Sequence, residues 1–328
     1  MEGTCPTLLL LVSPHHVPLA HTLALLAMTV VTVAIKVVPL DMACNSFDDQ
    51  YRGCGPNMTA ALPDLNCSEF QNNPLFARVW PEAVAKWQSQ GSRVSPLSSP
   101  DQAIALMAYT RNDLYQQFNA AVRVAGRSAQ EYRKNFHFKT LHFLLTQALG
   151  TLRHAQNVQC RRVFRGVRDV KFKAQPGQRV RFGQFISTSL SKKTAERFGR
   201  DTIFQVHTCH GVDIQQFSNY PNEEEVLIPP FETFEVTLVS RDRGRTLIQL
   251  HSNGTFSKYN CEWLRRKIEG SEGSMGGMRE LRRVREGSGV TGVQGGHEEG
   301  SGGTDDFGGW GSGGSGGPWG ERGGRRGP

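Results

Sequence analysis

Glycine is distributed so unevenly that only part of this 328-residue chain can form a packed core. Of the 36 glycines, 23 lie between Gly270 and Pro328, where branched aliphatic residues are almost absent. Such a segment cannot bury enough apolar surface to offset the entropy that it loses on ordering. We therefore expect a disordered tail over residues 269–328 and one globular domain over residues 40–268. The glycines keep no three-residue period and no longer repeat occurs, which excludes collagen and solenoid folds.

A single apolar run, from Val17 to Leu40, precedes this domain, so a multispanning membrane protein is excluded. Its uninterrupted part, Leu23 to Ile35, suits the apolar region of a secretory signal peptide better than a membrane span. No Lys or Arg occurs before Lys36, which leaves a signal anchor as one alternative and a buried helix of a cytosolic domain as another. We expect residues 1–39 to be a signal peptide or signal anchor, through which the protein could associate with a membrane.

The cysteines and glycosylation motifs also favour export. Six of the seven cysteines follow the apolar run, and none has the spacing of a zinc site, so we expect disulfide bonds and no metal. Asn-x-Ser/Thr acceptors occur at Asn57, Asn66 and Asn253, each in a polar stretch. We expect a protein of the secretory pathway that is either secreted or held on the outer face of the cell.

The net charge of +8 says less about function, because the Lys and Arg residues are dispersed along the chain. No stripe of basic and aromatic residues typical of RNA-binding domains interrupts them, so we expect no nucleic-acid partner. A solvated basic surface explains the charge, and such a surface would still attract an anionic ligand.

The pattern of apolar residues predicts helices first and strands afterwards, which indicates an α+β domain. A capping box, Ser128 to Glu131, opens a segment with helical periodicity that reaches Leu149. Further helices are expected over residues 114–124 and 192–198. Strands are expected over residues 163–172, 180–186, 202–207, 232–240 and 246–251.

Common catalytic motifs are absent from this domain. No Gly-x-x-x-x-Gly-Lys-Ser/Thr, His-Glu-x-x-His or Gly-x-Ser-x-Gly occurs, which weighs against P-loop enzymes, zinc proteases and α/β-hydrolases. The one Gly-x-Gly-x-x-Gly match, at residues 311–316, lies in the glycine-rich tail, where no strand and helix flank it.

Two strand segments carry polar groups that could bind an anion. Arg165 lies in the middle of the strand VFRGV, and its planar guanidinium suits a phosphate or carboxylate, although a structural salt bridge would also explain it. The hydroxyl residues 187–189 end the segment that begins VRFGQ. They could equally satisfy backbone groups at a sheet edge.

A third segment places three glutamates, residues 223–225, directly before the apolar residues Val226 to Ile228. If all three lie on the strand, Glu223 and Glu225 share one face and Glu224 takes the other. Two carboxylates on one face repel each other, which is tolerated best where a cation sits between them. An exposed acidic turn is the alternative.

The order Arg, then Ser-Thr-Ser, then Glu-x-Glu on successive strands resembles the signature of the arginine-specific mono-ADP-ribosyltransferases of the vertebrate ecto-enzyme family, most of all the GPI-linked type of skeletal muscle. The resemblance covers residues 47–264 and includes SFDDQYRGC, AALPDLN, FNAAVR, FKTLHFLLTQAL, VRFGQF and EEEVLIPPFETFEV. It implies a helical N-terminal part packed on a β-rich core of two sheets, with an NAD cleft between the sheets. It also implies transfer of ADP-ribose from NAD to protein arginines, with release of nicotinamide.

The resemblance assigns roles to individual residues. Glu225 is expected to stabilise the positive charge that develops on the nicotinamide ribose, and Glu223 to engage the acceptor guanidinium. Arg165 is expected to bind the phosphates or the ribose, and Ser187 to position NAD and Glu225. Three further positions match nucleotide contacts of the family: Tyr109, Gln184 and Ser218. The acceptors would be arginine-bearing proteins, and we expect a monomer.

The family pattern also implies two disulfides, Cys54 with Cys261 and Cys160 with Cys209, and leaves the pairing of Cys44 and Cys67 open. One feature departs from it: surface-anchored members end in an apolar tail, whereas this chain ends in GGSGGPWGERGGRRGP. Two other functions remain as alternatives. An NAD glycohydrolase would not need Glu223, and a non-enzymatic binding module would not need the intact set of Arg, Ser and Glu.

Overall fold

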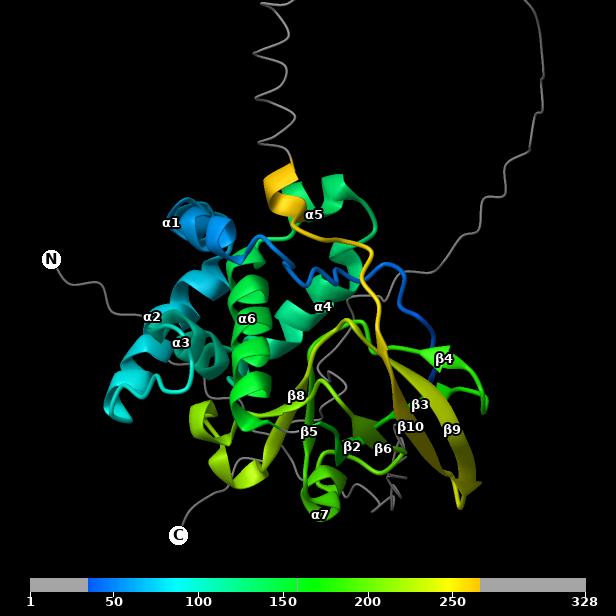
Figure 1. Ribbon diagram of the computed structural model, residues 1–328. Helices are drawn as coiled ribbons and strands as arrows, with labels where there is room; N and C mark the ends of the chain where they lie inside the picture. The colour runs from blue at the N-terminus through cyan, green and yellow to red at the C-terminus, as the bar shows by residue number, and fades with distance from the viewer. Residues whose placement is uncertain (1–34, 158, 266–328) are drawn as a thin grey trace, which may run out of the picture. The chain divides into compact units, whose positions relative to one another are not determined.

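The computed structural model describes residues 35–157 and 159–265 (Figure 1). Most of the predicted signal segment and the whole glycine-rich tail lie outside the described residues. Residues 36–39, which we assigned to the signal segment, form strand β1 (Lys36–Pro39). Among the described residues, no helix is both long enough and apolar enough to cross a membrane.

Helices occupy the first half of the described chain, as predicted. They are α1 (Gly55–Asn72), α2 (Pro74–Ser89), α3 (Pro100–Tyr109), α4 (Tyr115–Ala125), α5 (Ala129–Asn135) and α6 (Lys139–Gln156), and the short α7 (Lys192–Glu196) follows later. Side-chain caps begin several of them: Ser99 accepts a hydrogen bond from the N–H of Gln102, and Ser128 accepts one from Glu131 at 3.0 Å. One of the two hydrogen bonds of the predicted capping box, from the Glu131 N–H to the Ser128 hydroxyl, is therefore confirmed.

The single helix predicted over residues 128–149 is wrong, because the chain breaks it into α5 and α6. Phe136 takes an extended backbone conformation after α5, and Phe138 precedes the first residue of α6. The rings of Phe136 and Phe138 are both buried, and the ring centroid of Phe136 lies 5.9 Å from that of Phe47. Packing of two aromatic rings that are two residues apart requires this local departure from helical periodicity.

The strands form two sheets of unequal size. One sheet contains eight strands in the order β4-β9-β10-β6-β2-β5-β8-β7, and the other pairs β1 with β3 in parallel. The strands are β2 (Arg161–Val167), β3 (Val170–Lys173), β4 (Arg179–Val180), β5 (Ile186–Ser189), β6 (Thr202–Thr208), β7 (Val212–Asp213), β8 (Glu225–Ile228), β9 (Glu232–Asp242) and β10 (Arg245–Thr255). Two short 3-10 helices, η1 (Gln215–Phe217) and η2 (Pro221–Glu223), precede β8.

Two segments that we predicted as single strands each contain parts of two strands. The segment 163–172 contains β2 and β3, which belong to different sheets, and Asp169 between them has a positive φ of 59°. The segment 180–186 contains the end of β4 and the start of β5, with Gly183 at a φ of 63° between them. A positive φ turns the chain sharply, so neither segment can remain one straight strand. The strands predicted at 202–207, 232–240 and 246–251 are confirmed as parts of β6, β9 and β10.

Two apolar clusters meet at strands β5 and β8. The first joins the helices to Phe185 and Leu227, and the second packs residues of β2, β6, β9 and β10 together with Ile186 and Val226. Because side chains alternate along a strand, neighbouring residues of these short strands enter different clusters. The polar residues of β5 and β8 therefore lie at the boundary between the two apolar clusters.

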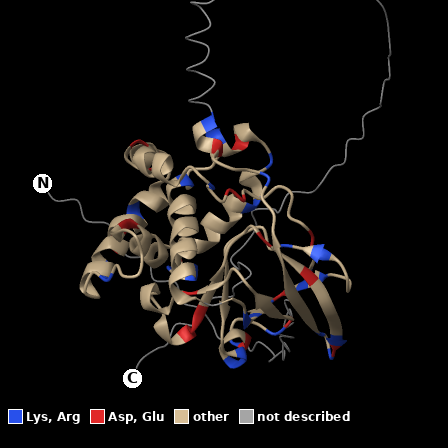
Figure 2. Ribbon diagram, viewed as in Figure 1, with Lys and Arg blue, Asp and Glu red and all other residues tan. Residues whose placement is uncertain are grey.

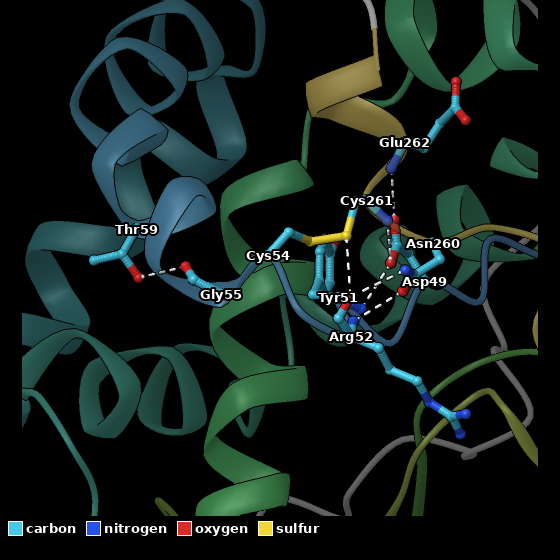
Figure 3. The surroundings of a disulfide bond; sticks show 9 residues. All are labelled: Asp49, Tyr51, Arg52, Cys54, Gly55, Thr59, Asn260, Cys261 and Glu262. Carbon is cyan, nitrogen blue, oxygen red and sulfur yellow. Dashed lines mark hydrogen bonds between the residues drawn. A yellow bond between two sulfur atoms is a disulfide. The ribbon is translucent and has the colours of Figure 1, made fainter. Parts of the chain in front are cut away.

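Both predicted disulfides are present. Cys54 immediately precedes α1 and bonds to Cys261, 207 residues later, so the bridge joins the two ends of the described domain (Figure 3). Cys160 bonds to Cys209 across the ends of β2 and β6. In the chain-entropy model the longer loop contributes about 5 kcal/mol to the free energy of unfolding. Cys44 and Cys67, whose pairing the sequence left open, are free and exposed.

A buried histidine makes the stability of this core depend on pH. His142 is fully buried, and its ring nitrogens lie 2.9 Å from the Tyr51 hydroxyl and 3.3 Å from the Phe47 carbonyl oxygen. Burial lowers the pKa of His142 to about 3. Since the unfolded chain protonates this ring near its ordinary pKa and the folded protein does not, the free energy of unfolding falls as pH drops from about 6.5 towards 3.

We expect the wild-type protein to lose about 2 kcal/mol more stability than His142→Gln between about pH 6.5 and pH 5. The comparison cancels the contributions of the carboxyl groups, which both proteins share. Urea unfolding at the two pH values measures it. Equal losses in the two proteins would show that the His142 ring is protonated in the folded state.

Candidate active site

Three neighbouring strands of the large sheet carry the predicted catalytic residues. Arg165 lies on β2, Ser187 on β5, and Glu225 is the first residue of β8, and these strands are adjacent in the order β2-β5-β8. The register pairs Ser189 with Glu225 on β8 and with Phe164 on β2, next to Arg165. The sheet therefore brings together residues that are up to 60 positions apart in the sequence.

Hydrogen bonds connect Arg165 to Ser187, and β5 to the helical half of the domain. Arg165 Nη1 donates to the carbonyl oxygen of Ser187 at 3.1 Å. The hydroxyl of Tyr109, the last residue of α3, lies 3.5 Å from Ser187 Oγ and donates to the Phe185 carbonyl at 3.1 Å. Tyr109 and Arg165 thus both hold β5, Tyr109 at the Phe185 carbonyl and the Ser187 hydroxyl, and Arg165 at the Ser187 carbonyl.

Glu225 is held by a second hydroxyl. Ser218, the residue after η1, donates from its Oγ to Glu225 Oε2 at 3.2 Å, and the Ser218 Oγ also accepts from the N–H of Tyr220 at 3.0 Å. The backbone carbonyl of Glu225 accepts a hydrogen bond from the N–H of Ile214 at 3.0 Å. One hydrogen bond therefore holds the backbone of Glu225, and another holds its carboxylate.

Charges are buried at this site, which is unusual for groups without a functional or structural partner. Arg165 and Glu225 are each only 2% exposed, and Ser218 and Tyr109 are each 1% exposed. Burial lowers the pKa of Arg165 to about 9, so its guanidinium keeps its proton at pH 7. Burial, together with the charge of Glu225, raises the pKa of Tyr109, so its hydroxyl remains a neutral donor.

Two residues of α4 belong to this site and were not singled out from the sequence. Arg123 Nη1 donates to Gln184 Oε1, and burial lowers the pKa of Arg123. Asn119 Nδ2 donates to the Tyr109 hydroxyl at 3.2 Å, and Asn119 Oδ1 accepts from the Phe185 N–H at 3.1 Å. Both lie in the motif FNAAVR, so the signal was present in a motif that we used only for the resemblance.

The predicted strand geometry of the three glutamates is wrong. Glu223 ends η2, Glu224 has a left-handed backbone with a φ of 49°, and β8 begins only at Glu225. Strand alternation therefore says nothing about the direction of Glu223. Its side chain is half-buried, that of Glu224 is exposed, and the Glu223 carbonyl accepts from Ser189 Oγ at 2.8 Å.

One group of possible metal ligands occurs in the described part of the chain, away from these residues. Ligand atoms of Cys160, His207 and Cys209 lie within 4.8 Å of one another. The two sulfurs are bonded to each other, so neither is available as a thiolate. Two hollows, of about 630 and 300 Å³, lie around β3 and β9 and include none of the site residues. The NAD cleft between two sheets therefore stays a prediction.

A buried carboxylate, a buried guanidinium and two hydroxyls on adjoining elements suit a reaction in which an anionic substrate develops positive charge. The guanidinium can hold phosphate oxygens, and the carboxylate can stabilise a sugar cation in surroundings of low dielectric constant. A simple anion bound to Arg165 would be repelled by the negative charge of Glu225. The geometry thus favours a substrate that carries both signs of charge.

Comparisons with known proteins agree with this chemistry. The family model described as NAD:arginine ADP-ribosyltransferase matches residues 40–258. The erythroblast NAD(P)(+)–arginine ADP-ribosyltransferase of Gallus gallus is 53% identical over 236 residues, which cover 71% of this chain and 78% of that protein. The GPI-linked NAD(P)(+)–arginine ADP-ribosyltransferase 1 of Homo sapiens is 48% identical over 247 residues, covering 70% and 76%.

Solved structures give the same result for the fold. The crystal structure of the eucaryotic mono-ADP-ribosyltransferase ART2.2 matches with a TM-score of 0.59 and 37% identity, over 68% of this chain and 98% of that chain. A mutant of ART2.2 solved in complex with NAD matches with the same TM-score and 38% identity. The resemblance drawn from the sequence motifs is confirmed, and the chain belongs to the NAD:arginine ADP-ribosyltransferase family.

Proposed function

We propose that this protein transfers ADP-ribose from NAD to the arginine side chains of proteins and releases nicotinamide. The observation that carries the proposal is the buried Glu225 carboxylate on β8, two strands from the buried Arg165 guanidinium in the same sheet. Family membership supplies the reaction, and the site residues assigned to it from the sequence lie on adjoining elements.

Glu225 stabilises the positive charge that develops on the ribose when the bond to nicotinamide breaks. A carboxylate that is only 2% exposed does this better than one in water, because the Coulomb attraction is stronger where water is excluded. The Ser218 hydroxyl orients Glu225 through the 3.2 Å hydrogen bond to Oε2. Since the carboxylate is held in place beforehand, little reorganisation is required as the charge appears.

Arg165, Ser187, Tyr109 and Gln184 bind and position NAD. Arg165 keeps its charge at pH 7 and presents a planar donor group of the kind that recognises phosphate oxygens in pairs. Ser187 and Tyr109 are held together by their own contact, so a nucleotide would meet a preformed pair of hydroxyls.

Glu223 engages the guanidinium of the acceptor. A protonated guanidinium is a poor nucleophile, so a carboxylate is needed to orient it and polarise it toward the ribose. Glu223 precedes the strand that begins with Glu225, and it is more exposed than Glu225. A residue that meets a second protein needs this access, whereas the residue that meets the ribose cation needs burial.

The protein acts on protein acceptors at the cell surface or outside the cell. GPI-linked relatives and two disulfides support this location. Export would depend on the apolar run at residues 17–40, and we propose that the protein works as a monomer.

Incubation of the purified protein with NAD labelled in the adenylate part tests the reaction and its acceptor together. Agmatine presents a free guanidinium, and a lysine analogue of similar size serves as the control. We expect label on agmatine alone. Label on neither compound, with free ADP-ribose accumulating, would indicate an NAD glycohydrolase, and intact NAD would indicate a binding module.

A further inference from the structure

A group of basic side chains lies away from the active site, on β3 and on the hairpin formed by β9 and β10. We define the basic patch by five residues: Lys171, Lys173, Arg241, Arg243 and Arg245. In Figure 2 basic residues mark the tip of this hairpin, at the lower right of the view. The tip is a tight turn in which Arg243 and Gly244 have φ values of 47° and 80°. Such turns match the twist of the flanking strands, so the arginines are presented on a rigid element.

The charges of the basic patch are not neutralised within the described part of the chain. Four of the five side chains are exposed and Lys171 is half-exposed, and none of the five makes an ion pair or a side-chain hydrogen bond there. At the tip of the hairpin the carboxylate is that of Asp242, which pairs in register with Arg245, whereas Glu232 and Glu235 lie at the other end of β9. The five cations outnumber the carboxylate of Asp242 beside them and therefore create a local positive field, which attracts an anionic partner.

Two hollows adjoin the basic patch. Lys173 and Arg241 line both of them, the larger with a volume of about 630 Å³ and the smaller with about 300 Å³. Gln175 and Gln178 add amide groups to the larger hollow, and Val37 adds an apolar wall to the smaller one. Two hollows that share two cations suit a ligand that presents several anionic groups along its length.

We propose that the basic patch binds a sulfated polysaccharide. Sulfate esters remain charged at every physiological pH, and the amide of Gln175 can donate to sugar hydroxyls and sulfate oxygens. The amide of Gln178 already donates to the Leu40 carbonyl and accepts from the Gln175 N–H, so it holds the wall of the larger hollow in place. A location at the cell surface or outside the cell, which the relatives support, gives access to such chains.

The other polyanions fit this surface less well. A membrane-binding tip would need large apolar side chains, but the tip consists of Asp242, Arg243 and Gly244. A nucleic-acid site would need an exposed aromatic ring for base stacking, but the ring of Phe172 packs against Phe204, with 5.1 Å between the centroids. Charge complementarity, with no large apolar side chain at the tip and no exposed stacking ring in Phe172, is the feature that a sulfated sugar chain requires.

Binding at the basic patch is separable from catalysis. The patch uses β3, β9 and β10, whereas the active-site residues lie on β2, β5 and β8, on α3 and α4, and around η1 and η2. Substitutions in the patch should therefore leave NAD hydrolysis unchanged. This readout distinguishes a failure of the present proposal from a failure of the proposed transferase function.

The test compares two variants with the same change in net charge on immobilised heparin and on chemically desulfated heparin. The patch variant carries Lys171→Gln, Lys173→Gln, Arg241→Gln and Arg245→Gln. The control variant changes four exposed cations that lie elsewhere and make no ion pair with the described residues: Lys86→Gln, Arg127→Gln, Lys134→Gln and Lys193→Gln. Vesicles rich in phosphatidylserine serve as the lipid arm, and circular dichroism confirms folding of both variants.

We expect the wild type and the control variant to bind heparin at about 0.15 M salt, and the patch variant to bind at least tenfold more weakly. Desulfated heparin should not bind. Equal weakening in both variants would overturn the proposal, because it would mean that only net charge matters. Binding to vesicles but not to heparin would overturn it in favour of a lipid partner, and no binding to heparin would also overturn it.

Discussion

Glu225→Gln is expected to lower the rates of NAD hydrolysis and of transfer to arginine together, each by about 10³-fold. Both reactions break the same bond to nicotinamide, and both need a negative charge against the ribose. Glutamine keeps the size of the side chain and can still accept the hydrogen bond from Ser218, so only the charge is removed. Initial rates with labelled NAD, with and without agmatine, measure both losses.

Glu224→Gln is the matched control for this change. Glu224 is the adjacent residue and has the same side chain, but it is exposed. We expect both of its rates to stay within about twofold of the wild type, because surface substitutions rarely disturb the fold. If the Glu225→Gln protein retained more than a tenth of either activity, Glu225 would not be the residue that stabilises the ribose cation.

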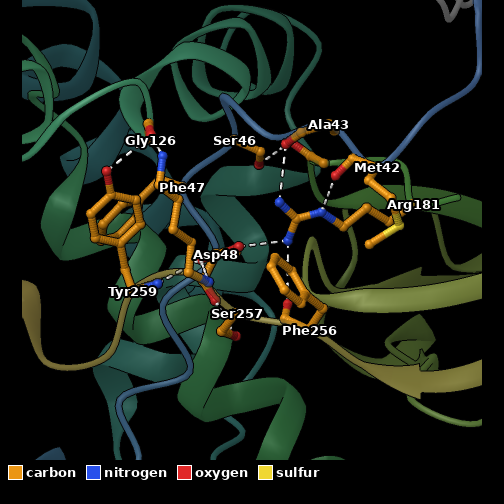
Figure 4. A network of polar contacts seen from close by, with 12 residues as sticks. Met42, Ala43, Ser46, Phe47, Asp48, Gly126, Arg181, Phe256, Ser257 and Tyr259 are labelled. Atoms are coloured by element: carbon orange, nitrogen blue, oxygen red, sulfur yellow. Dashed lines mark hydrogen bonds and ion pairs between the residues drawn. The ribbon is translucent and has the colours of Figure 1, made fainter. Parts of the chain in front are cut away.

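Asp48→Asn is expected to lower the free energy of unfolding by about 3 to 5 kcal/mol. Asp48 and Arg181 have no solvent exposure in their side chains, and Asp48 Oδ2 lies 2.6 Å from Arg181 Nη1 (Figure 4). The other oxygen, Oδ1, accepts hydrogen bonds from the backbone N–H groups of Lys258 and Tyr259, at 2.8 and 3.0 Å. Removal of the negative charge would leave the buried guanidinium without its counter-charge and would turn an amide N–H toward it.

The network around Asp48 joins three distant parts of the chain, which explains why we expect one substitution to cost so much. Arg181, next to β4, also donates to the carbonyl oxygens of Ala43 and Phe256, at 3.0 and 3.2 Å. The exposed Asp64 on α1 provides a control, and Asp64→Asn should change stability by less than about 0.5 kcal/mol. Chemical denaturation of the three proteins at pH 7 makes the comparison. A loss below 1 kcal/mol for Asp48→Asn would mean that water or another carboxylate compensates Arg181.

The sequence predicted α4, α7, β6, β9 and β10 because their periodicity or composition reflects which face is buried, and it made no prediction for α1, α2 and α3. It failed where packing overrides periodicity. Phe136 and Phe138 both enter the aromatic core, and helix α5 must end for them to do so. The division of segment 163–172 between two sheets depends on the turn at Asp169, and one aspartate between β-branched and aromatic residues is a weak turn signal.

The network around Asp48 also could not be predicted from the sequence. Asp48 and Arg181 are 133 residues apart, and neither has a neighbour that signals an ion pair. The motifs SFDDQYRGC and VRFGQF contain these two residues, but a motif does not say which of its side chains meet. Contacts between distant segments require the folded chain.

The residues of the candidate site came from the family resemblance, because each of the three polar segments taken alone also had a structural explanation. Arg165, Ser187 and Glu225 lie on adjacent strands, as expected from their order. Arg123 and Asn119 were missed because helical residues with ordinary polar side chains give no local signal of a distant partner. The position of Glu223 depends on the left-handed backbone of Glu224, which strand alternation could not foresee.

The ratio of transfer to hydrolysis in Glu223→Gln tests most directly whether Glu223 and Glu225 have different roles in the reaction. One preparation of the variant is mixed with labelled NAD and agmatine, and the ADP-ribosylated agmatine and the free ADP-ribose are counted in the same sample. We predict that the ratio falls at least 100-fold while the rate of ADP-ribose release stays within about threefold of the wild type. A variant whose two products fell in parallel, with the ratio unchanged, would contradict the assignment of the acceptor to Glu223 and of the ribose to Glu225.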